Sequence, residues 1–172
     1  MSANEELHEQ MHGARDPFER TVAASMAIIA ALLAIVSVLG QHFNTEELLK
    51  EQESADQWAF SQAKDIRRYS AQVAQDTLTA SKADSNLVQR YAKEGARYDQ
   101  ERREIQHQAQ ELQAESARNG KRANRFHLAE VLLEIAIVLS SLAILSKSRY
   151  FFWLGTGSSL VGVLLGATAF LN

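Results

Sequence analysis

Residues 21–41 read TVAASMAIIAALLAIVSVLGQ, and no side chain in this stretch carries a charge. A bilayer core about 30 Å thick is crossed by about 20 apolar residues in an α-helix, because the helix rises about 1.5 Å per residue. The stretch therefore predicts a transmembrane helix, which we place at residues 21–43. A cleaved signal peptide is the alternative, but its apolar core would be shorter, and no convincing small-x-small cleavage site precedes the polar region.

Two further apolar stretches lie near the end of the sequence. Residues 151–172 begin next to an aromatic cluster of the kind found at headgroup boundaries. Residues 127–146 are mostly apolar, but they contain His127 and two glutamates, Glu130 and Glu134. We predict that residues 127–146 form the second span and residues 151–172 the third, joined by a short basic link at residues 147–150.

The block between the first two spans, residues 44–126, is strongly polar. It holds 14 acidic and 14 basic side chains and no proline, and it is rich in good helix formers. A neutral surface of mixed sign argues against nucleic acid as a partner, since a nucleic-acid groove needs a basic excess. The chain has no cysteine, so disulfides and thiolate metal sites are excluded.

The polar block contains two patterns of small and apolar residues that repeat every seven residues, which is typical of coiled coils. Residues 44–47 (NTEE) resemble a helix start, and residues 81–86 (SKADSN) are turn-prone. Folding back near Lys82 pairs residues whose numbers sum to 164, so that Ile66 meets Tyr98 and Tyr69 meets Gly95. The predicted seam consists of Ala59, Ile66, Tyr69, Val73, Tyr91, Gly95, Tyr98, Ile105 and Leu112.

These elements together predict the fold class. We expect an all-α integral membrane protein, with three transmembrane helices and a long antiparallel, coiled-coil-like helical hairpin between the first and second. The seam has few large apolar contacts for helices of this length, so the hairpin alone is marginal.

Two sets of residues suggest contacts with another chain. Trp58 and Phe60 fall on either side of the predicted seam positions in the first half of the polar block and would be exposed. Exposed aromatic side chains there invite a partner. In the last span, Ser158, Gly162 and Gly166 recur every four residues and place small side chains on one helix face. Such faces let helices approach closely in the bilayer. We therefore expect a homo-oligomer, with other membrane subunits as the alternative partners and lipid around the spans.

Polar residues gather where the first span ends and the second begins. Helix direction places them near the same membrane surface, where they could form a proton or cation site or satisfy one another in a polar plug between helices. We favour the plug. The set consists of Gln41, His42, His127, Glu130 and Glu134.

The tail, residues 1–20, is acidic and contains His8 and His12 in an H-E-x-x-H pattern, the spacing used by zinc peptidases. Catalytic zinc also needs a third protein ligand and a cleft that controls water. Glu5 could add a ligand for adventitious metal, but the motif stands beside Gly13 and Pro17 with no surrounding core. We interpret the match as fortuitous and expect no catalytic residue, no resident metal and no cofactor.

The order of features resembles a family of bacterial membrane proteins described only as a domain of unknown function. The stretches that carry the resemblance are residues 54–64 (SADQWAFSQAK) and 133–141 (LEIAIVLSS). The resemblance covers nearly the whole chain. It implies an integral membrane location and assigns no activity, so no functional residue can be carried over.

Our functional hypothesis is a non-enzymatic, self-associating membrane protein with a structural or scaffolding role. The alternatives are an accessory subunit of a larger membrane complex and a small ion or proton channel or transporter with Glu134 in its path. The basic link at residues 147–150 follows the positive-inside bias. We therefore expect a multi-pass protein of the bacterial inner membrane with a cytoplasmic N-terminus.

Overall fold

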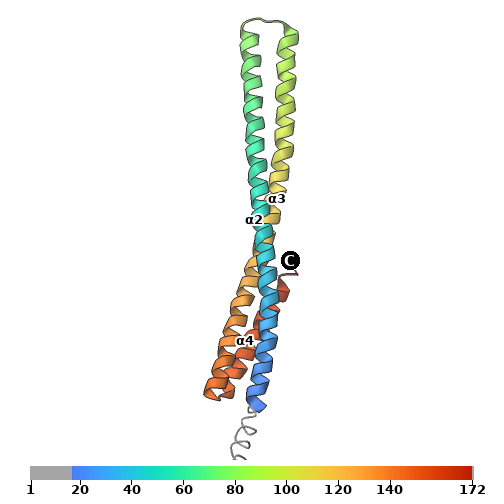
Figure 1. Ribbon diagram of the computed structural model, residues 1–172. Helices are drawn as coiled ribbons and strands as arrows, with labels where there is room; N and C mark the ends of the chain where they lie inside the picture. Colours follow the sequence, from blue (N-terminus) through green and yellow to red (C-terminus); the bar gives the residue numbers. More distant parts are fainter. Residues whose placement is uncertain (1–16, 172) are drawn as a thin grey trace, which may run out of the picture. The chain divides into compact units, whose positions relative to one another are not determined.

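The structure, a computed structural model, describes residues 17–171 and is helical in that range apart from two short connections and residues 169–171. Its helices are α2 (Pro17–Ala80), α3 (Ser85–Ser146) and α4 (Arg149–Thr168) (Figure 1). Each is long and apolar enough to cross a membrane. The all-helical prediction and the three apolar helices are thus confirmed.

The two long helices correct the predicted boundaries. Residues 44–47 were expected to start a helix, but they lie inside α2, which continues without a break from the first apolar stretch into the polar block. In the same way α3 joins the second half of the polar block to the second apolar stretch. Good helix formers on both sides of residue 44 leave nothing to end the helix there, so a capping sequence has no effect.

Two short turns connect the helices. Between α2 and α3, Lys82 adopts a positive φ of 53°, and the Asp84 carboxylate accepts a hydrogen bond from the backbone N–H of Asn86 at 2.9 Å. Between α3 and α4, Lys147 has a φ of 51°. A left-handed residue just after a helix is a common way to stop it, so both reversals are local features of these turns.

The described residues divide into two compact units. The first contains residues 17–43 together with residues 121–171, and the second is the segment Asn44–Gly120. The predicted hairpin ended at residue 126, six residues later.

The first unit packs parts of all three helices around a small apolar core. Phe126 is its centre: its ring stacks on Phe43 with centroids 5.7 Å apart and meets Phe170 edge-on at 5.6 Å. The other core residues are aliphatic or alanine, namely Ile29, Val36, Ala129, Leu133, Ala136 and Ala169. Near one end of α4, the Arg125 guanidinium donates to the Thr168 carbonyl at 2.6 Å.

Candidate interaction surface

The second unit is an antiparallel pair of helices formed by the α2 arm (residues 44–80) and the α3 arm (residues 85–120) (Figure 1). The α3 arm turns its predicted stripe toward α2. Tyr91, Gly95, Tyr98, Ile105 and Leu112 are all at least partly buried, and no large apolar side chain of this arm is among the exposed ones. Gly95 lies beside Ala71 of α2, and the Tyr98 ring centre lies 5.7 Å from the Lys64 ammonium.

The α2 arm presents a different face from the one predicted. Its buried residues are Ser54, Ser61 and Ala71. The predicted seam residues of this arm are exposed: Ile66 by 68%, Tyr69 by 64% and Val73 by 48%, with Ala59 exposed as well. The α2 half of the predicted seam is therefore wrong, and these side chains point away from α3.

Small polar side chains explain this choice of face. The Ser54 hydroxyl donates to the Ala109 carbonyl at 2.9 Å, and the Ser116 hydroxyl donates to the Glu47 carbonyl at 3.1 Å. Both bonds join a side chain to the backbone of the opposite helix, so the helices lie close together at these points. Serine allows such an approach and satisfies its own hydroxyl, whereas a large apolar side chain would hold the helices apart.

The axial pairing differs only slightly from the predicted one. The two serine bonds join residues whose numbers sum to 163, against the predicted 164. Gly95, which was expected to face Tyr69, has Ala71 as its neighbour instead, since a Cβ placed on Gly95 would lie 3.9 Å from the Ala71 Cβ. The predicted axial position of the pairing was thus nearly correct. The predicted rotation of α2 about its own axis was wrong.

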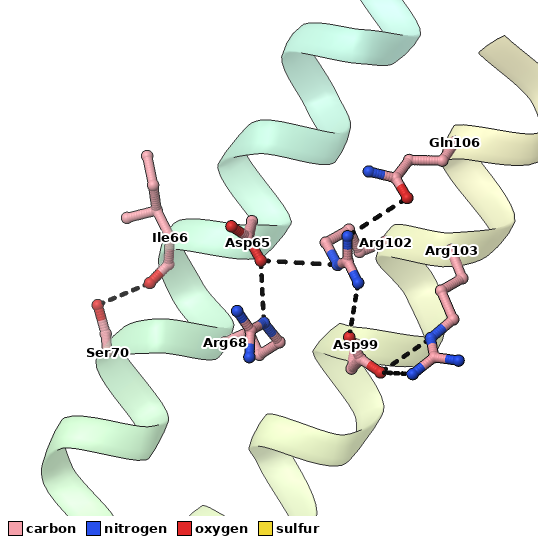
Figure 2. A network of polar contacts seen from close by, with 8 residues as sticks. All are labelled: Asp65, Ile66, Arg68, Ser70, Asp99, Arg102, Arg103 and Gln106. Atoms are coloured by element: carbon pink, nitrogen blue, oxygen red, sulfur yellow. Dashed lines mark hydrogen bonds and ion pairs between the residues drawn. The ribbon is translucent and has the colours of Figure 1, made fainter. Parts of the chain in front are cut away.

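Charged side chains bridge the middle of the seam, as Figure 2 shows. Arg102 lies between two carboxylates, at 2.9 Å from Asp99 and 3.6 Å from Asp65. The Asp65 carboxylate also accepts a hydrogen bond from the Arg68 guanidinium at 2.9 Å. Arg103 donates two hydrogen bonds to Asp99. The network joins α2 to α3 through the Asp65–Arg102 pair.

A second ion pair crosses the seam next to this network. Lys64 donates to Glu101 at 2.5 Å, and the Lys64 ammonium lies 5.4 Å from the centre of the Phe60 ring. The Lys64 hydrogen bond is the main cause that lowers the pKa of Glu101 below its ordinary range. The hydrogen bonds from Arg102 and then Arg103 lower the pKa of Asp99. Both carboxylates therefore favour the charged form in the folded hairpin.

A shallow groove of about 350 Å³ runs along the same unit. Trp58 lines it, and its other lining residues come from both arms: Glu47, Glu51, Ser54, Ala55, Gln113, Ser116 and Ala117. Among the described residues no group of three or more histidine, cysteine, aspartate or glutamate side chains could hold a metal. Phe60, on the opposite flank of the helix, is 55% exposed.

The polar cluster predicted at the end of the spans is only partly brought together. His127 lies 3.3 Å from the Glu130 carboxylate, and its imidazole is near Gly40, since a Cβ placed there would lie 3.9 Å from the ring. Gln41 and His42 are exposed. Glu134, one turn beyond Glu130, is also exposed on the surface of the first unit.

The small-residue face of the last span packs inside the chain. The Ser158 hydroxyl donates to the Leu132 carbonyl of α3 at 2.8 Å. A Cβ placed on Gly162 would lie 3.1 Å from the Ala129 carbonyl oxygen, and one on Gly166 would lie 3.5 Å from the Ala129 Cβ. This face is a helix-packing surface, but its partner is α3 of the same chain. It is therefore not open for oligomerisation.

Two small residues of α4 were missed by the sequence analysis. Gly155 and Ser159 are buried, and a Cβ on Gly155 would lie 3.0 Å from the Ala136 carbonyl oxygen. They continue the four- and three-residue spacing of Gly162 and Gly166 toward the start of α4, so that spacing could have identified them. The metal candidates Glu5, His8 and His12 lie outside the described residues.

Comparison with known proteins gives one match. The model of a family described as "Domain of unknown function (DUF4337)" matches residues 18–172, nearly the full length of the chain. No curated protein and no solved structure matches. The match agrees with the resemblance carried by residues 54–64 and 133–141.

Proposed function

The chain belongs to the DUF4337 family, and we propose that it is a self-associating integral membrane protein with a structural, non-enzymatic role. In this proposal the apolar parts of α2, α3 and α4 cross a membrane and the second unit stands outside it as a hairpin. The proposal rests on one observation, which is the exposed apolar side of the α2 arm. We call this side the outer stripe and define it by Leu48, Ala55, Ala59, Ile66, Tyr69 and Val73.

The outer stripe lies in a polar unit, where its exposure to water is unfavourable. Leu48 is 56% exposed, and the exposed fractions of Ile66 and Tyr69 are higher still. Burying apolar surface contributes about 25 cal/mol per Å², and contiguous exposed apolar patches on soluble surfaces mark contact sites. Exposed aliphatic residues in the first unit, such as Ile28 and Val38, are instead satisfied by lipid.

Copy number tests the proposal. The protein is extracted in a mild detergent and analysed by native mass spectrometry and by light scattering during size exclusion. We expect an assembly of more than one copy without enzymatic turnover of its own. A well-folded monomer at the concentrations found in its own membrane would contradict self-association.

A second candidate, an accessory subunit of a larger complex, is favoured by the position of Glu134. The residue is exposed on the surface of α3 next to Ile135 and Val131, which are exposed too. A carboxylate near the bilayer centre costs about 2.5–3.5 kcal/mol on insertion scales. A basic or polar group of a different subunit would offset that cost, whereas the same surface of a second copy would bring a like charge.

The variant Glu134→Gln separates this candidate from the first, because glutamine keeps the size and hydrogen bonding but loses the charge. We expect an accessory subunit to lose its foreign partner on native mass spectrometry, while Glu130→Gln, one turn earlier, retains it. Unchanged copy number without any foreign subunit in either variant supports the self-associating role. Lost ion flux in proteoliposomes with unchanged assembly would favour a channel.

A further inference from the structure

We propose that the outer stripe is a coiled-coil interface for the same stripe of a second copy, with the two α2 arms parallel and in register. The contact uses only the part of the outer stripe that lies within residues 59–73. This inference rests on the proposed self-association and adds the surface, the partner and the geometry.

The spacing of the stripe is that of a two-stranded coiled coil. Residues 55, 59, 62, 66, 69 and 73 alternate steps of four and three, which keeps one seam facing a partner helix. The seam that faces α3 uses the opposite positions of the same repeat, those of Ser54, Ser61 and Ala71. One set of alternate positions holds Ala59, Ile66 and Val73, and the other holds Ala55, Gln62 and Tyr69.

The orientation of a second copy is set by α2 itself. One unbroken helix carries both the first apolar span and the stripe. Two copies in one membrane have their spans pointing the same way, and each stripe follows its span after the same number of residues. Identical residues therefore reach the same level, and a two-fold axis between the helices pairs each residue with its own copy.

The side chains of the stripe suit this pairing. Gln62 is exposed at a seam position, and an amide carries both donors and acceptors, so two copies of it can bond to each other. A single polar seam residue of this kind specifies register.

Charges limit the contact to residues 59–73. Asp65 is the single charged side chain at a seam or flanking position in this range, and Arg68 and Arg102 of its own hairpin already pair with it. Before the range, Glu51 and Asp56 would face each other across the parallel pair, and after it Asp76 occupies a seam position. Like charges therefore stop the contact at both ends, which leaves about 22 Å of helix between them.

Single cysteines test the geometry directly, because the chain has none of its own. Ile66→Cys in native membranes should form a disulfide-linked dimer under mild oxidation, and co-expression with a tagged copy should give the mixed dimer. The matched control is Arg67→Cys, which lies at the same level but about 100° around the helix, and it should stay monomeric. An Arg67→Cys dimer, an Ile66→Cys monomer or a disulfide from Ile66→Cys to another protein overturns the inference.

A charge in the stripe tests its contribution to assembly. Ile66→Asp should lose the dimer on light scattering in mild detergent, whereas Arg67→Asp should keep it, with equal helical content by circular dichroism in both. An Ile66→Asp protein that remains oligomeric overturns this interface but leaves self-association standing. An unaltered protein that is monomeric overturns both.

Discussion

At the scale of single residues, small side chains decide where helices touch. Ser54 and Ser116 in the hairpin and Gly155 and Gly162 in α4 each lie against the backbone or side chains of a neighbouring helix. A larger side chain at any of them pushes two helices apart. The residues at the contacts are therefore chosen for size as much as for polarity.

Two glycines of α4 give a matched comparison. A Cβ on Gly162 would lie 3.1 Å from both the Ala129 carbonyl oxygen and the Leu132 Cβ, whereas one on Gly157 would meet nothing within 4 Å. We expect Gly162→Ala to lower the stability of the first unit by about 1–3 kcal/mol through overpacking. Gly157→Ala should raise it by about 0.5–1 kcal/mol, because alanine is the better helix former. Thermal unfolding in detergent measures both, and an equal response would contradict the packing of α4 on α3.

At the scale of the elements, the α2 arm carries two different seven-residue repeats on opposite faces. One is small and polar and faces α3, and the other is apolar and faces outward. The α3 arm carries a single stripe. A helix with two such faces can pack against one partner on each, so the hairpin and the proposed dimer do not compete for the same residues.

The two helices of the hairpin can be checked by crosslinking. Cysteines at Ser54 and Ala109 should form a disulfide within one chain, because the Ser54 hydroxyl lies 2.9 Å from the Ala109 carbonyl. Cysteines at Ala59 and Ile105, the pair predicted from the 164 sum, should not, since Ala59 points away from the seam. Mobility on a non-reducing gel after site-specific cleavage distinguishes the two, and the reverse result would restore the predicted face.

The ion pairs across the hairpin predict how its stability depends on pH. Glu101 and Asp99 have pKa values lowered in the folded state by their hydrogen bonds to Lys64 and to Arg102. A lowered carboxyl pKa contributes stability that is present above the unfolded-state value and lost as pH falls through the folded one. The stability of the hairpin should therefore begin to fall below about pH 4.5.

The matched variants for the pH experiment are Glu101→Gln and Glu104→Gln. Glu101→Gln should flatten the acid limb of the melting curve, because it removes a titrating group. Glu104→Gln, whose carboxylate accepts only a hydrogen bond from the Gln100 amide, should leave the curve unchanged. An acid limb of equal slope in all three proteins would show that the Lys64 pair does not contribute.

At the scale of the whole molecule, the order of apolar and polar segments sets the number of crossings. In the proposed arrangement, three crossings would place the two chain ends on opposite sides of a membrane, and the basic link at residues 147–150 favours the cytoplasmic side for itself and for the N-terminus. We therefore expect the α2–α3 turn to lie outside the cytoplasm. Polar segments beyond about 60 residues translocate largely regardless of their charge, so the basic side chains before the second span do not oppose this.

A single cysteine at Ser85, the first residue of α3 beside the α2–α3 turn, tests this topology. An impermeant thiol reagent should label it in intact cells, while a cysteine at Ser148, in the α3–α4 link, should be labelled only after lysis. The opposite pattern would place the hairpin in the cytoplasm. Both residues lie beside a turn, so neither substitution disturbs a packed helix face.

The sequence by itself determined that the chain is helical, where its three apolar stretches lie and approximately how the two arms of the hairpin pair along their length. These features follow from local composition and from the seven-residue spacing of small and apolar residues. The family match is equally a property of the sequence.

Only the tertiary structure decided which face of the α2 arm meets α3. The most apolar stripe was the natural choice when residues 44–80 were considered as a helix with its own start. In the structure α2 does not restart, and the buried residues of its arm are Ser54, Ser61 and Ala71. On the α3 arm the buried residues are Ala109 and Ser116. The hydrogen bonds of Ser54 and Ser116 to the backbone of the opposite helix require the two arms to lie close together. This close contact through small side chains outweighs the apolarity of the other face and leaves Ile66 and Tyr69 facing outward.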